Sequence, residues 1–221
     1  MMTNLFSTFD PATSSNISMN WMSMTVIIML MPMSYWMMPN RINSLITGMI
    51  MKLNIEFKTL MGMNASSLTM MMISLFMFIL MNNFMGLLPY IFTSSSHMTF
   101  TLTLSLPMWL SLMIYGWVNK TNQMFAHMIP VGTPVMLMPF MVIIETMSNM
   151  IRPGALAVRL MANMIAGHLL MSLLGNNLKM NMLAPMIIMI QMTLMLFEMA
   201  VAVIQSYVFS VLMTLYTSEL T

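Results

Sequence analysis

The hydrophobic positions of this chain gather into long runs separated by short polar stretches. Three runs, at residues 19–38, 68–88 and 99–118, have about the 20 residues that a helix needs to cross a bilayer. Two others, at 135–174 and 183–216, are much longer, which predicts strongly tilted helices joined as a hairpin by a short turn. We therefore expect an all-α polytopic membrane protein with about five crossings.

This pattern predicts a single membrane domain over residues 1–221, with a polar N-terminal segment at 1–18. The sequence Arg152-Pro153-Gly154 interrupts the fourth apolar run. Because proline removes a helical hydrogen bond and clashes with the preceding turn, we expect a kink or a helix boundary there.

Residues 41–61 have a different pattern, in which apolar side chains recur every three or four positions among charged and polar ones. The apolar positions are Ile42, Leu45, Ile46, Met49, Leu53, Phe57 and Leu60. This spacing predicts an amphipathic helix lying in the membrane interface. A helix packed on a soluble domain would show the same pattern, but the chain offers no such domain.

The composition agrees with a membrane protein and excludes other classes. Only 5% of the residues are charged and the mean hydropathy is +0.86, whereas a soluble domain carries about 25% charged residues. The absence of cysteine excludes a disulfide scaffold. A net charge of +2 gives no basic patch for nucleic acid, and the 41 methionines are interpreted as generic apolar residues.

The basic residues predict the orientation of the chain. With five crossings, Arg41, Lys52, Lys58 and Lys120 lie on one side, and only Lys179 lies in a loop on the other. The positive-inside rule then places the N-terminus outside and the C-terminus inside.

Apart from Arg152 at the predicted interruption, three of the twelve formal charges fall inside the last two apolar runs, namely Glu145, Arg159 and Glu198. An ionisable side chain at the centre of a bilayer costs roughly 2.5–3.5 kcal/mol on insertion scales, so each one indicates function. His168 and Gln205 are further polar residues in these runs.

Arg159 lies on a helix face of small residues, with Ala155, Ala162 and Ala166 beside it and Asn163 one turn later. Small residues let a second helix approach closely. Because arginine does not deprotonate in proteins, Arg159 would act as a fixed charge. Two interpretations are open: pairing with a carboxylate on a partner helix, or an internal salt bridge with Glu145 or Glu198.

Glu145, His168 and Glu198 can titrate near neutral pH when burial changes their environment. Gln191, Glu198 and Gln205 recur every seven residues and so share one stripe. This arrangement favours a proton relay, although Glu145 and Glu198 would also suit structural pairs. No spacing typical of a metal site, no phosphate-binding loop and no cofactor motif is present, so we expect no metal, no cofactor and no ATP hydrolysis in this chain.

The run Ile151-Arg152-Pro153-Gly154-Ala155-Leu156-Ala157-Val158-Arg159-Leu160, continued by Met161-Ala162-Asn163-Met164-Ile165-Ala166-Gly167-His168-Leu169-Leu170, strongly resembles the subunit a family of mitochondrial F-type ATP synthases. The resemblance extends to Met1–Phe6, to Leu88-Pro89-Tyr90 with Ser96-His97, and to Val142–Glu145. It covers the whole chain and is greatest for arthropod members.

The resemblance implies a proton-conducting stator subunit in the membrane sector, packed against a rotating ring of small hairpin subunits, the c-ring. Arg159 matches the essential arginine, which faces the ring carboxylate and separates two aqueous half-channels. Asn163, His168, Glu198, Glu145 and Gln205 match positions that line or support those channels. In bacterial relatives the acid and the histidine at the positions of His168 and Glu198 are exchanged, which suggests a coupled pair.

The same resemblance implies other partners and a location. We expect contacts with peripheral-stalk and other membrane subunits and with the lipid bilayer, in the mitochondrial inner membrane. The N-terminus would face the intermembrane space and the C-terminus the matrix. Two alternatives stay open: a structural membrane subunit of a respiratory complex, and a self-contained proton-coupled transporter, for which we find no inverted repeat.

Overall fold

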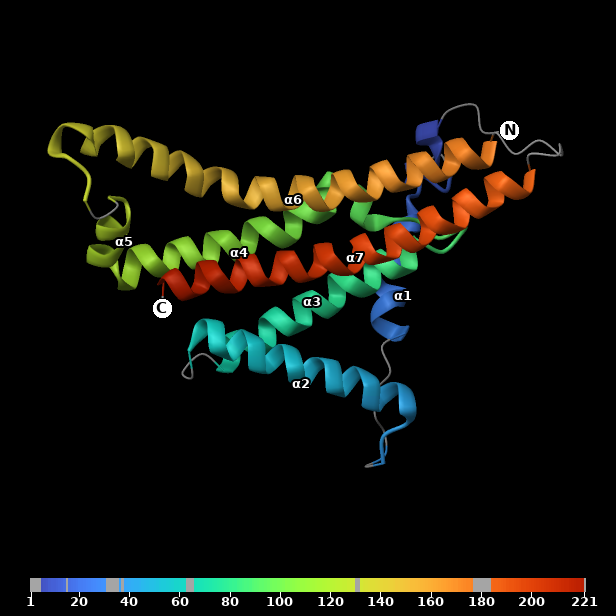
Figure 1. Cartoon of the computed structure of the whole chain (residues 1–221), viewed down its shortest axis with the longest axis horizontal. Helices are drawn as coiled ribbons and strands as arrows, with labels where there is room; N and C mark the ends of the chain where they lie inside the picture. The colour runs from blue at the N-terminus through green and yellow to red at the C-terminus, as the bar shows by residue number, and fades with distance from the viewer. Residues whose placement is uncertain are drawn as a thin grey trace.

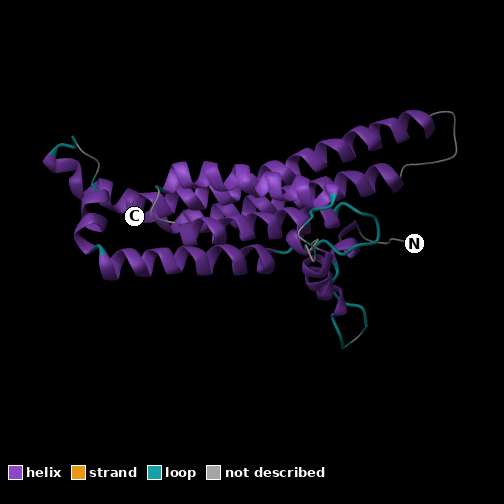
Figure 2. Ribbon diagram, turned by 90° about the horizontal axis from the view of Figure 1, so that it is seen from below, coloured by secondary structure: helices purple, strands orange, loops and turns teal. Residues whose placement is uncertain are grey.

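The computed structural model describes residues 5–14, 16–30, 36, 38–62, 66–129, 132–176 and 184–220. Within these ranges all regular structure is helical (Figures 1 and 2). The α-helices are α1 (Ser23–Leu30), α2 (Arg41–Met61), α3 (Ser66–Gly86), α4 (Met98–Asn119), α5 (Thr121–His127), α6 (Met138–Asn176) and α7 (Ala184–Leu220). The all-α class predicted from the sequence is confirmed.

Four helical segments are long and apolar enough to cross a membrane. They are Ser67–Gly86, Met98–Asn119, Val135–Asn176 and Ala184–Ser218. The predicted first crossing, 19–38, contains a shorter apolar helix at Met19–Met29, and its residues 31–35 and 37 lie outside the described residues. The short helix α5 was not predicted; it is only seven residues long and has no apolar run of its own.

The helix α6 passes through Pro153 without ending, so the expectation of a helix boundary at 152–154 is wrong. Figure 1 shows α6 bent near its middle, which agrees with the alternative expectation of a kink. The Pro153 side chain is buried. Proline costs one backbone hydrogen bond and bends the axis, but the packing of the flanking turns against neighbouring helices preserves the helix on both sides.

The long helices run side by side along the long axis of the molecule, and α6 and α7 are antiparallel (Figure 1). α7 packs along α3, and α4 packs along α6. Their shared core is one apolar cluster, formed by Phe57, Met72, Ile73, Ile79, Met108, Leu156, Leu160, Phe209 and Met213. The members of this cluster on α6, Leu156 and Leu160, lie near the middle of that helix, and those on α7, Phe209 and Met213, lie in its C-terminal third.

The amphipathic helix α2 covers residues 41–61, and its apolar positions divide between two faces. Phe57 and Met61 are buried against the bundle, where α2 contacts α3 and α7. Ile42, Leu45 and Met49 are exposed. The first face therefore anchors α2 to the bundle, and the second remains available to the surrounding medium.

The second part of the connection between α3 and α4, Thr93–Ser96, is polar and buried. The Ser94 hydroxyl donates to Asn82 Oδ1 at 3.1 Å, and the Thr93 hydroxyl donates to Ser96 Oγ at 3.1 Å. All four residues are less than 9% exposed, and the 3₁₀ turn η3 (Ser94–Ser96) contacts α6. Internal hydrogen bonds make this burial possible and hold the α3–α4 hairpin against the helix that carries Arg159.

Candidate functional site

Four of the six predicted site residues line one cavity between α6 and α7, with a volume of about 420 Å³. They are Asn163 and His168 from α6, and Glu198 and Gln205 from α7. The remaining lining side chains are mostly apolar. We call this space the α6–α7 cavity. Gln191, the third member of the heptad stripe, is not among its lining residues.

The carboxylate of Glu198 is the most enclosed ionisable group in this cavity, since the residue is only 8% exposed. Neither of its oxygens has a hydrogen-bond partner among the described residues, and the same is true of His168 Nε2. Unpaired polar atoms in a buried site are costly and are rarely kept without a function. Both groups can therefore form a hydrogen bond with a polar molecule that enters the cavity.

Gly167 makes room for this carboxylate. A Cβ atom at position 167 would lie 2.8 Å from Glu198 Cδ and 2.8 Å from Glu198 Oε1, far inside van der Waals contact. The Glu198 side chain thus rests directly on the backbone of α6, between Asn163 and His168. Sequence reasoning had no reason to single out Gly167, because its role depends on a residue 31 positions away.

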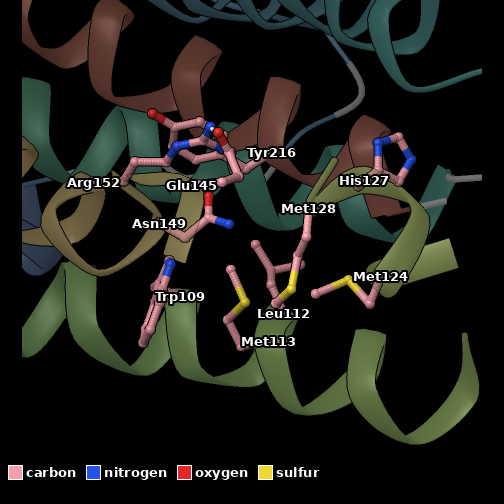
Figure 3. A pocket seen from close by; sticks show the side chains of 10 residues that line it. All are labelled: Trp109, Leu112, Met113, Met124, His127, Met128, Glu145, Asn149, Arg152 and Tyr216. Carbon is pink, nitrogen blue, oxygen red and sulfur yellow. Dashed lines mark hydrogen bonds and ion pairs between the residues drawn. The ribbon is translucent and has the colours of Figure 1, made fainter. Parts of the chain in front are cut away.

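Glu145 lies apart from this group, in a second cavity of about 200 Å³ bounded by α4, α5, α6 and α7. We call it the α4–α6 cavity. Figure 3 shows Trp109 and Met113 rising from α4 toward the polar side chains of α6. The residues that line it are Trp109, Leu112, Met113, Met124, His127, Met128, Glu145, Asn149, Arg152 and Tyr216.

Glu145 pairs with Arg152, whose Nη2 lies 3.3 Å from Glu145 Oε1. The Arg152 guanidinium carbon also lies 4.9 Å from the centre of the Tyr216 ring, within the range of a cation–π contact. Sequence analysis interpreted Arg152 only as part of a kink. The seven-residue spacing of Glu145 and Arg152 on one helix was the available signal, because it places them on the same face.

Arg159 lines neither cavity. It is exposed, as are Ala155, Ala162 and Ala166, of which Ala166 also lines the α6–α7 cavity. Over the described ranges Arg159 forms no salt bridge, so the internal pairing with Glu145 or Glu198 is not observed. Within the same ranges no group of three His, Asp or Glu side chains is placed to hold a metal ion.

An apolar layer separates the two cavities. Along α6, Leu156 and Leu160 of the core cluster lie between Arg152 and Asn163. Along α7, Phe209 and Met213 lie between Gln205 and Tyr216. Ser206, Ser210 and Thr214 of α7 are also buried at this level, and each of their hydroxyls donates to a carbonyl of its own helix. The two cavities share no lining residue.

Comparison with known proteins identifies the family. The profile described as ATP synthase A chain matches residues 17–218. The chain belongs to this family. It is similar over 99% of its length to proteins named ATP synthase subunit a: it is 57% identical to those of Aedes aegypti, Drosophila melanogaster and Locusta migratoria, and it covers 99% of each. The resemblance to arthropod members is thereby confirmed.

Because the family is that of an ATP synthase subunit, a substitution at Gly167 can test whether the position of the Glu198 carboxylate affects proton pumping. We expect Gly167→Ala to leave the complex assembled, because the methyl group meets only the end of a flexible side chain. The Glu198 carboxylate must rotate away, and a displacement of this size should lower ATP-driven proton pumping by about tenfold. The measurement is pumping into vesicles, normalised to the amount of assembled complex.

The matched control is Gly154→Ala, on the same helix, where an added Cβ meets no atom within 4 Å. Pumping in this control should be unchanged. Equal pumping by the Gly167→Ala and Gly154→Ala complexes would contradict a role for the position of the Glu198 carboxylate.

Proposed function

We propose that this chain is the proton-conducting stator subunit of the membrane (Fo) sector of an ATP synthase. In this proposal the α6–α7 cavity and the α4–α6 cavity are the inner ends of two offset aqueous half-channels. Protons pass between them only on the carboxylates of a rotating c-ring, and Arg159 separates the two paths.

The observation that carries this proposal is the separation of the two cavities along α6 and α7, since they share no lining residue. Leu156, Leu160, Phe209 and Met213 form an apolar layer between the cavities. The hydroxyls that α7 buries at this level, on Ser206, Ser210 and Thr214, each donate to a carbonyl of their own helix. Arg159 lies at the level of this layer, between Leu156 and Leu160 in the chain, but on the exposed face. A permanent positive charge at this point repels a proton that would cross directly.

An interruption of this kind is physically necessary. Each proton that crosses yields about 2.3 kcal/mol per 100 mV of membrane potential. A continuous polar path through one subunit would release this energy without rotating anything. Two half-channels that are connected only through the rotating c-ring convert this free energy into rotation.

The surface around Arg159 suits a partner helix that carries a carboxylate. Ala155, Ala162 and Ala166 are exposed beside Arg159 and present little bulk, so a second helix can pack closely. An exposed guanidinium without a salt bridge among the described residues can pair with an incoming carboxylate. It favours the ionised form of that carboxylate, which drives the release of its proton into the exit half-channel.

We further propose that the chain lies in the mitochondrial inner membrane with its C-terminus in the matrix and its N-terminus in the intermembrane space. The end of α4, which Lys120 caps, lies at the same end of the bundle as the C-terminus (Figure 1), in accord with the positive-inside rule. α2 would lie in the interface, with the exposed Ile42, Leu45 and Met49 toward lipid. Peripheral-stalk and other membrane subunits are the further partners.

The chain's own role in this proposal is transport. It moves protons between groups and carries no nucleotide-binding motif in its sequence, so ATP synthesis belongs to the assembled complex.

Cysteine cross-linking tests the proposed docking face, since the natural chain has no cysteine that would react in the background. We expect an Ala162→Cys chain to form a disulfide with a ring subunit that carries one cysteine beside its carboxylate. The matched control is Met51→Cys, equally accessible on α2, which should form none. Failure of the Ala162→Cys chain to co-purify with a ring would favour a structural subunit of another complex instead.

A further inference from the structure

Arg152 forms an ion pair with Glu145, and the sequence pattern gives it no functional role. The pair lies at least eleven residues along α6 from Asn163 and His168. Its surroundings are distinctive. Arg152 is half-buried, it contacts an acid on its own helix, and it lies over an aromatic ring from α7.

We infer that Arg152 is a positioning residue for Glu145, and that the Tyr216 ring holds Arg152 in place in turn. The inference rests on the proposed function, in which Glu145 serves the α4–α6 cavity. It adds a residue from each long helix to that half-channel.

The first step is the ion pair. With Arg152 Nη2 at 3.3 Å from Glu145 Oε1, the guanidinium holds one carboxylate oxygen and so restricts the direction in which the carboxylate points. Both side chains line the α4–α6 cavity, so the other carboxylate oxygen remains available to that space. An unpaired Glu145 would be free to turn away through its rotatable bonds, because the site is not tightly enclosed.

The second step is the ring. An arginine side chain has many rotamers, and pairing with a half-exposed acid restrains it only weakly. The flat face of Tyr216, 4.9 Å from the Arg152 guanidinium carbon, limits the guanidinium to one plane. Figure 3 shows Tyr216 against Arg152 on the side of the cavity that also carries Glu145 and Asn149. His127, from α5, is the other titratable group that faces this cavity.

The same contacts could serve only to hold α6 against α7, so the experiment must distinguish a structural role of Arg152 from a positioning role. A residue with only a structural role affects how much complex assembles. A positioning residue affects the proton flux of each complex that has assembled.

The experiment uses whole ATP synthase complexes in vesicles, with ATP-driven proton flux divided by the amount of assembled complex. We expect Arg152→Gln to lower this flux by about threefold to tenfold, as loss of a partly exposed coupled pair predicts. Arg152→Lys should recover only part of the loss, because an ammonium group keeps the ion pair but has no flat face to lie on the Tyr216 ring. The Glu145→Gln/Arg152→Gln double variant should be no slower than Glu145→Gln alone.

A second pair of variants keeps the test decisive if Arg152→Gln fails to assemble. Tyr216→Leu should lower the flux, and Tyr216→Phe, which keeps the ring, should be faster than Tyr216→Leu. The control is Tyr115→Leu, a tyrosine of α4 that does not line the cavity and should leave the flux unchanged.

The outcomes separate this inference from the proposed function. Slow flux in Glu145→Gln with normal flux in Arg152→Gln would overturn the inference alone. Equal flux in Tyr216→Leu and Tyr216→Phe would overturn the role of the ring. Normal flux in Glu145→Gln would overturn the assignment of this cavity to a half-channel, and the inference with it.

Discussion

An Arg159→Ala complex should assemble normally and pump no protons when it hydrolyses ATP, with a loss of at least about 100-fold. Arg159 is exposed and makes no salt bridge among the described residues, so its removal leaves no buried charge unpaired and no core contact broken. What disappears is the fixed positive charge beside the apolar layer. Proton pumping in vesicles and the amount of complex on native gels are the two measurements.

The matched control for this variant is Val158→Ala, the preceding exposed residue on α6, which should pump normally. ATP synthesis at the normal rate in Arg159→Ala would refute the proposed separation of two half-channels. Loss of assembly before any loss of flux would instead favour the structural-subunit alternative.

Replacing Glu198 by Gln should lower proton flux by about 100-fold, while the complex still assembles. The amide has nearly the same shape as the carboxylate and fits the same space against Gly167. It cannot take up and release a proton, and proton transfer by a positioned side chain typically accounts for about 10²–10⁴-fold in rate. Flux per assembled complex in vesicles measures the effect.

Two further variants sharpen this test. Met199→Leu, next to Glu198 but exposed to the outside, should leave the flux unchanged. Because His168 and Glu198 line one cavity, exchanging them in a His168→Glu/Glu198→His chain should restore more flux than Glu198→His alone. Equal flux in the exchanged chain and in Glu198→His would mean that the two residues do not act as a pair.

The fold follows from the sequence to a large extent, because each apolar run must form its own backbone hydrogen bonds in a bilayer and only a helix does so within one segment. The predicted runs 68–88 and 99–118 therefore correspond to α3 (Ser66–Gly86) and α4 (Met98–Asn119). Of the two expectations at Pro153, a kink or a helix boundary, the structure has the kink, because packing against α4 and α7 outweighs the local cost of a proline.

The candidate site follows from the sequence only in part. A heptad stripe and the high cost of intramembrane charge were sufficient to select Glu198 and Gln205, and the structure brings them to Asn163 and His168. The same reasoning grouped Glu145 with them. Glu145 instead lies beyond the apolar layer, because 18 residues of helix separate it from Asn163 along the axis of α6.

Three properties can be read from the sequence alone: the chain is a helical membrane protein, its charge is confined to a few residues, and Arg159 lies among small side chains. These are properties of single segments, and the bilayer enforces them residue by residue. Other properties follow from the packing of the helices against one another. They are which polar residues share a cavity, the space that Gly167 leaves for the Glu198 carboxylate, and the position of Arg152 between Glu145 and Tyr216. These are contacts between helices, and they depend on the register in which α6 packs against α4 and α7, which no single segment contains.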